Sequence, residues 1–122
     1  MSLTTVAILL CAVGALVTAR LSWIFFQDPE AGLLDTTHRA EQLPQVMTDR
    51  YVAMTFLAIA AAIYGDPLVI VVLFISFSFM GFADALIYRR AGHPIVKHVA
   101  AGAAALIVVV VALFAHLKNG AA

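Results

Sequence analysis

Charged side chains are scarce in this chain, because Asp, Glu, Lys and Arg make up 11% of its 122 residues and the formal net charge is zero. A protein that binds nucleic acid needs a basic surface, so the lack of net positive charge argues against a nucleic-acid partner. The chain has a single cysteine, Cys11, so no disulfide can form within it. The apolar residues and the few ionisable ones must therefore carry the fold and the function.

Apolar residues account for 64% of the sequence, and the mean hydropathy is +1.04. Soluble domains are roughly 45 to 50% apolar, so the chain belongs in a lipid bilayer. A membrane-spanning helix needs about 20 apolar residues, and four stretches approach or reach that length: 3–26, 51–65, 67–88 and 95–117. The sequence therefore predicts an all-α fold, a single domain over residues 1–122 that forms a bundle of four transmembrane helices.

The limits of these helices follow from local signals. The first stretch lacks a basic start and continues past Arg20, which favours a retained helix over a cleaved signal peptide. Gly65, Asp66 and Pro67 predict a tight turn between the second and third spans, because Pro cannot continue a helix from the preceding turn.

Lys and Arg residues predict the orientation of the bundle. Four spans place both termini on one side, where Lys118 is the only such residue in the loops and tails. The other side collects most of the basic residues: Arg39, Arg50, Arg89, Arg90 and Lys97. By the positive-inside rule we expect an inner-membrane protein, most simply bacterial, with both termini outside.

Four ionisable residues lie at a similar depth near the inner ends of the predicted spans. Arg20 belongs to the first span, and Arg50 opens the second. Asp84 lies near the end of the third span, and His98 near the start of the fourth. An ionised group inside a span turns toward a partner or a wet cavity, because it costs about 2.5–3.5 kcal/mol at the bilayer centre. We expect Asp84 to face Arg20 or Arg50, either in a functional site or in a pair that only holds helices together.

A histidine close to a carboxylate can exchange a proton near neutral pH. His98 and Asp84 are therefore the predicted acid–base pair, with Arg20 or Arg50 stabilising negative charge. A simpler interpretation of Arg20 is that its long side chain extends to the lipid headgroups.

Aromatic residues lie near the same helix ends. Trp23, Tyr51 and Tyr88 are expected to contact a ligand, or to form the aromatic belt at the membrane surface. His93 precedes Pro94 in a loop, where we expect it to be solvated. The chain lacks the His and Cys spacings typical of zinc and di-iron sites, so no metal and no cofactor is predicted.

The segment 27–49 is a long predicted cytoplasmic loop. Within it, residues 35–43 suit a short interfacial helix with Asp35 as its N-cap and Pro44 at its end. Thr48 and Asp49 are then expected to cap the second span. Such a short helix could close over the polar site as a lid or lie on the membrane surface as a plain amphipathic segment.

Residues 49–113 resemble small four-helix bacterial membrane proteins of the loosely DoxX-like group. The resemblance depends on Arg50, on Asp84 followed by a basic pair and Gly92, and on His98. It implies a four-helix membrane fold and points to the same polar residues, but it implies no particular chemistry, because that group has no general activity.

Three functions remain open from the sequence. The first is a site that binds a small lipophilic molecule and catalyses an acid–base isomerisation or cyclisation, although the sequence does not decide whether the site is catalytic. The second is an accessory or assembly subunit of a membrane complex. The third is a small transporter or channel that works as a homo-oligomer, which is disfavoured because Thr18, Thr55, Ser76 and Ser78 form no continuous polar track.

Overall fold

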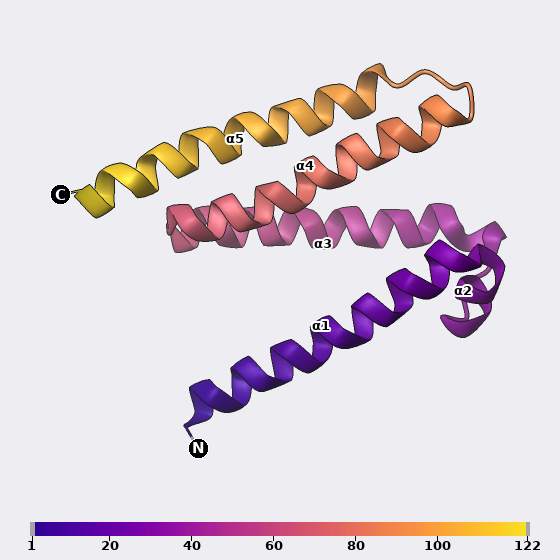
Figure 1. Ribbon diagram of the computed structural model, residues 1–122, viewed down its shortest axis with the longest axis horizontal. Helices are drawn as coiled ribbons and strands as arrows, with labels where there is room; N and C mark the ends of the chain where they lie inside the picture. The colour runs from indigo at the N-terminus through magenta and orange to yellow at the C-terminus, as the bar shows by residue number, and fades with distance from the viewer. Residues whose placement is uncertain (1, 122) are drawn as a thin grey trace. The chain divides into compact units, whose positions relative to one another are not determined.

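The computed structural model describes residues 2–121, and these form helices and the turns between them with no strand. The predicted all-α fold is confirmed (Figure 1). The elements follow one another along the chain as α1 (Leu3–Gln27), α2 (Pro29–Asp35), the 3-10 helix η1 (Ala40–Gln42), α3 (Leu43–Tyr64), α4 (Pro67–Arg90) and α5 (Val96–Ala121).

Four of these segments are long and apolar enough to cross a membrane: Leu3–Gln27, Ala40–Tyr64, Pro67–Arg90 and Val96–Gly120. No residue of α1 is buried, and large apolar side chains such as Ile63 and Phe79 are exposed along the other spans. Water would oppose so large an apolar surface, whereas lipid chains cover it at no cost. The chain is an integral membrane protein.

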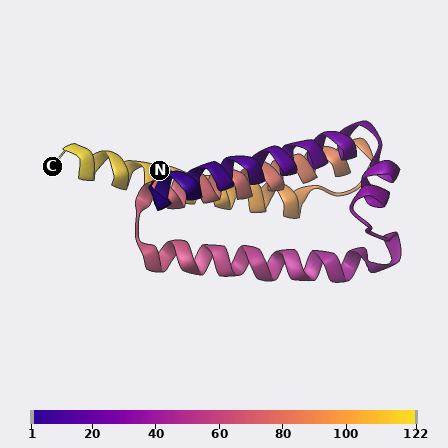
Figure 2. The same ribbon diagram turned by 90° about the horizontal axis from the view of Figure 1, so that it is seen from below.

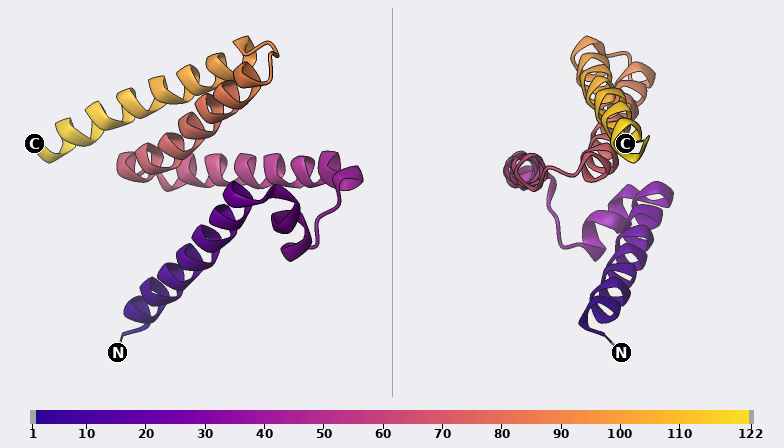
Figure 3. Two further views of the ribbon diagram at one scale, coloured as in Figure 1. Left: turned by 45° about the vertical axis from the view of Figure 1, so that its right-hand side comes forward. Right: turned by 90° about the vertical axis from the view of Figure 1, so that its left-hand side faces the viewer.

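Two compact units divide the chain, residues Met1–Arg50 and Tyr51–Ala122. In the first unit, α2 contacts the end of α1 (Figure 3). Asp28 begins α2 as an N-cap, since its Oδ1 accepts hydrogen bonds from the N–H groups of Glu30 and Ala31 at 3.0 and 3.1 Å. Gly32 lies so close to Phe25 that an added Cβ would be 2.6 Å from the ring.

The end of α2 is a tight turn that closes on Thr37. The N–H of His38 donates to the carbonyl of Leu33 at 2.8 Å, and that of Thr37 to Leu34 at 3.1 Å. This is the Schellman pattern, in which the residue after the cap takes a left-handed conformation. Thr37 has φ of 58°, a conformation that a β-branched residue rarely adopts.

The predicted layout of segment 27–49 was wrong in three respects. Asp35 ends α2 rather than capping a helix over 35–43. Pro44 lies in the first turn of α3, where its missing N–H costs nothing, rather than ending a helix. Thr48 is inside α3 and its hydroxyl donates to the Pro44 carbonyl at 3.0 Å, so it does not cap the second span. The second span therefore begins well before Tyr51, which removes its apparent shortness.

In the second unit, the turn expected at Gly65, Asp66 and Pro67 is confirmed. Gly65 has φ of 75°, and Asp66 caps α4 by accepting a hydrogen bond from the N–H of Leu68 at 2.8 Å. Figure 2 shows the chain reversing direction here between α3 and α4.

Helices α4 and α5 pack against each other along a seam of small residues. The buried positions on α4 are Val71, Ser78, Gly81 and Ala85, and those on α5 are Gly102, Ala105, Val109 and Ala112. Successive buried positions on each helix are three, four or seven residues apart. That spacing is typical of helices that cross at a small angle with a left-handed twist. Small side chains let the two backbones approach closely, which is how helices associate in lipid.

The two backbones come very close to each other at Gly81 and Gly102. A Cβ added to Gly81 would lie 2.6 Å from the backbone nitrogen of Gly102 and 2.7 Å from its Cα. At the same level the hydroxyl of Ser78 donates to the carbonyl of Gly102 at 3.0 Å. Because the neighbour of Gly81 is backbone, no larger residue fits there without moving a helix.

The turn from α4 to α5 repeats the pattern seen after α2. The N–H of His93 donates to the Tyr88 carbonyl at 2.9 Å, and that of Gly92 to the Arg89 carbonyl at 3.1 Å. Gly92 has φ of 77° and takes the left-handed position without strain. The turn fixes the ends of both helices relative to each other.

Candidate functional site

The α4–α5 seam continues into a polar layer at its loop end. Tyr88 follows Ala85 by three residues, and His98 precedes Gly102 by four, so each occupies the next position of the seam on its own helix. Asp84 lies one turn before Tyr88. The helix pairing therefore brings these three side chains together from two elements.

Distances define this layer, which we call the Asp84–Tyr88–His98 cluster. The Oδ2 of Asp84 lies 3.9 Å from the Nδ1 of His98. The rings of Tyr88 and His98 are stacked, with centroids 4.6 Å apart and planes 10° apart. The ring of His93 packs edge-on against the Tyr88 ring, with the two centroids 6.0 Å apart and an interplanar angle of 67°.

Both ionisable groups of the cluster are reachable from outside, since the Asp84 side chain is 49% exposed and that of His98 is 34% exposed. The separation of 3.9 Å exceeds a hydrogen bond, so a proton passes between them only after a small closure or through one water molecule. Tyr88 restrains the plane of the imidazole by stacking. The arrangement can hold a proton close to a carboxylate and present the second imidazole nitrogen to a ligand.

Arg20 has a partner in its own unit. Its Nη1 lies 3.2 Å from the Oδ2 of Asp35, and the hydrogen bond ties α1 to α2. The sequence assigned Asp35 to a helix cap and so missed this pair. Arg50 ends the first unit, and the expectation that Asp84 faces Arg20 or Arg50 stays a prediction.

The three predicted aromatic residues differ in their surroundings. Trp23 stacks on Phe26 within α1, with ring centroids 5.8 Å apart. Tyr51 is 58% exposed, but it lies inside α3, which begins at Leu43, rather than at the start of its span as predicted. Only Tyr88 of the three stacks on an ionisable residue of the candidate site.

His93 is exposed, as expected of a solvated loop residue, but the sequence analysis did not predict that its ring also packs edge-on against Tyr88. The signal was present in the sequence. A Gly after a helix predicts a Schellman turn. In that turn the residue after the Gly donates its N–H to the carbonyl five residues earlier in the helix. With Gly92 in the turn, His93 must meet Tyr88.

Hydroxyl groups in the spans bond mostly to their own helices. Thr18 donates to the Gly14 and Ala15 carbonyls, Thr55 to Tyr51, and Ser76 to Val72. Local bonds of this kind let polar residues lie among apolar ones without a water-filled path. Within residues 2–121, no group of three His, Cys, Asp or Glu side chains is placed to hold a metal ion.

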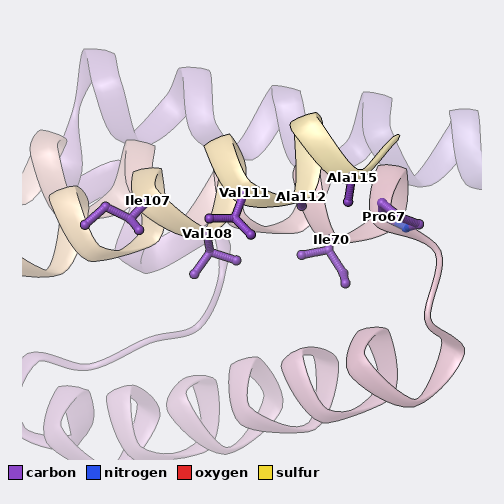
Figure 4. A pocket seen from close by; sticks show the side chains of 7 residues that line it. All are labelled: Pro67, Ile70, Ile107, Val108, Val111, Ala112 and Ala115. Carbon is purple, nitrogen blue, oxygen red and sulfur yellow. The ribbon is translucent and has the colours of Figure 1, made fainter. Parts of the chain in front are cut away.

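An apolar groove lies at the opposite end of the hairpin from the Asp84–Tyr88–His98 cluster (Figure 4). Its volume is about 380 Å³, and its lining is Pro67, Ile70, Ile107, Val108, Val111, Ala112 and Ala115. No charged or polar side chain lines it, so the groove can hold an acyl chain or an apolar helix but offers no chemistry.

Comparison with known proteins adds no constraint, because no family model, curated protein or solved structure significantly matches the chain. The resemblance to the DoxX-like group therefore stays a prediction. The helices and their hydropathy define its class, a small helical integral membrane protein.

Proposed function

We propose that the Asp84–Tyr88–His98 cluster binds the polar end of a small lipophilic molecule and moves a proton on it. One observation carries the proposal: a carboxylate and an imidazole from two helices lie 3.9 Å apart, with a tyrosine stacked on the imidazole. Ionisable residues in a membrane span are costly, and their retention in partnered groups is typical of functional sites.

Each side chain would have a distinct part in an isomerisation. The Nδ1 of His98 is the nitrogen nearer to Asp84, so Nε2 is left to meet the ligand. His98 would take a proton from one ligand carbon and return it to another, a step that balances without any oxidant or second reactant. Asp84 would stabilise the imidazolium formed in between, and binding would shorten their contact, as often happens when a ligand enters.

The arginines would contribute unequally. Arg50 is the candidate for stabilising negative charge that develops on the ligand. The hydrogen bond from Arg20 to Asp35 supports a structural part for Arg20 within the first unit.

A proton-exchange experiment tests this proposal. The purified protein in detergent is incubated with a long-chain methyl ketone in heavy water, and deuterium uptake beside the carbonyl is followed by mass spectrometry. We expect the wild type to accelerate deuterium uptake. His98→Gln should lower this acceleration about a hundredfold or more, and Asp84→Asn should lower it less.

His116→Gln is the matched control, because His116 lies near the other end of α5. It should exchange protons as the wild type does, and all variants should keep their thermal unfolding temperature. Equal uptake by the wild type and His98→Gln would contradict the proposal.

A second candidate, a non-enzymatic accessory subunit, is favoured by α1. Beyond the end that α2 contacts, its residues are largely apolar and none is buried, a surface that suits a partner helix in the membrane. On that reading Asp84→Asn and His98→Gln lower the unfolding temperature, and no variant affects proton exchange.

A further inference from the structure

The turn from α4 to α5 carries positive charge that no carboxylate of its own unit pairs with. Arg89 and Arg90 end α4, and Lys97 lies in the first turn of α5. No Asp or Glu follows Asp84 in the sequence. Within residues 51–121 of the second unit, none of these three cations is within ion-pair distance of a carboxylate, and all three are exposed. We call Arg89, Arg90 and Lys97 the cationic turn.

The backbone of this turn is fixed rather than mobile. The hydrogen bonds from Gly92 to Arg89 and from His93 to Tyr88 close it, and the His93 ring packs on Tyr88. A ligand that binds the three cations therefore orders little chain, which lowers the entropic cost of binding.

Helix length places the cationic turn at the level of lipid headgroups. Helix α4 has 24 residues, about 36 Å at 1.5 Å per residue, whereas the hydrocarbon core is about 30 Å thick. Its last turn thus emerges among the phosphates. Just below it, Leu86 and Ile87 are exposed and apolar, a surface suited to acyl chains.

We propose that the cationic turn is a binding site for the headgroup of an anionic phospholipid. Guanidinium groups hold phosphate through paired charge-assisted hydrogen bonds, and Lys97 adds a further positive charge. A lipid satisfies the charge and the apolar surface below it together, which a free phosphate ion cannot do. The site is separate from the proton chemistry proposed above, because it uses none of the residues of the Asp84–Tyr88–His98 cluster.

The test is a lipid titration of the full chain in detergent, followed by native mass spectrometry. The probes are short-chain phosphatidylglycerol, which is anionic, and phosphatidylcholine, which has no net charge. A juxtamembrane cation contributes about fivefold to binding of an anionic lipid. We therefore expect phosphatidylglycerol to bind more tightly, by up to about a hundredfold for three cations, and millimolar inorganic phosphate not to displace it.

Charge variants locate the site. R89Q/R90Q should weaken phosphatidylglycerol binding about 25-fold, from two losses of about fivefold each, and R89K/R90K should retain most of the affinity. K118Q is the matched control, since Lys118 is the basic residue at the other end of α5, and it should bind as the wild type does. If R89Q/R90Q does not fold, K97Q with its expected loss of about fivefold replaces it.

Either of two results would overturn the proposal. One is equal affinity for the two lipids in the wild type. The other is unchanged phosphatidylglycerol binding in R89Q/R90Q or, where it replaces that variant, in K97Q. Added salt gives an independent check, because it should weaken phosphatidylglycerol binding and leave phosphatidylcholine unaffected.

Discussion

The α1–α2 and α4–α5 hairpins are built with the same devices but differ in how firmly those devices act. In each hairpin a glycine allows a close contact, an ionisable pair links the helices, and a Schellman turn follows a helix. Gly32 meets the ring of Phe25, which can rotate away, whereas Gly81 meets the backbone of Gly102, which cannot. The comparison teaches that α4–α5 is held by backbone fit, while α1–α2 is held by adjustable side chains.

The largest expected effect comes from replacing these glycines. Gly81→Ala should destabilise the protein by about 1–3 kcal/mol, because the helices must move apart. Gly32→Ala should destabilise the protein clearly less, since the Phe25 ring can move. Reversible unfolding in mixed micelles measures both.

Gly14→Ala is the control for these variants, because nothing lies within 4 Å of a Cβ added to Gly14. It should leave stability unchanged or raise it slightly, by up to about 1 kcal/mol from helix propensity. If Gly32→Ala and Gly81→Ala are equally destabilising, the distinction between the hairpins fails.

The two turns offer a sharper comparison, because Thr37 and Gly92 occupy the same position of the Schellman pattern. The left-handed conformation costs a residue other than Gly about 1–2 kcal/mol. Thr37→Gly should therefore stabilise the protein, by about 1 kcal/mol once the extra freedom of Gly in the unfolded chain is subtracted. Gly92→Thr should destabilise it by a similar amount.

Unfolding of both variants in the same micelles checks this prediction. Gly120→Ala controls for general effects of replacing glycine in the second unit, because nothing lies within 4 Å of a Cβ added to Gly120. A destabilised Thr37→Gly variant would show that the threonine makes a contact worth more than the strain it bears.

The smallest expected effect is that of the Arg20–Asp35 pair. Its side chains are 65% and 42% exposed, and exposed ion pairs contribute about 0.2–1 kcal/mol. A double-mutant cycle with Arg20→Gln and Asp35→Asn measures the coupling. A coupling near zero would mean that the packing of Gly32 on Phe25 alone holds α2 in place.

Much of the fold was predictable from the sequence, because the bilayer sets helix length and Gly65, Asp66 and Pro67 are typical of a turn. The pairing of Asp84 with His98 was expected as well, since both residues lie at one depth near adjoining helix ends. The layout of segment 27–49 was not predictable, because Pro44 is compatible with either end of a helix. The part that Gly81 plays in the close seam was not recognised, because glycine and alanine are common throughout membrane helices.

The central claim is that the close packing at Gly81 aligns Tyr88 with His98 and so builds the candidate site. The ring-proton chemical shifts of His98, measured by NMR in micelles, test it most directly, because a tyrosine ring stacked at 4.6 Å shields them. The account predicts upfield signals relative to His116 that return to ordinary positions in both Tyr88→Leu and Gly81→Ala. Signals that match those of His116 in the wild type and do not move in either variant would contradict it.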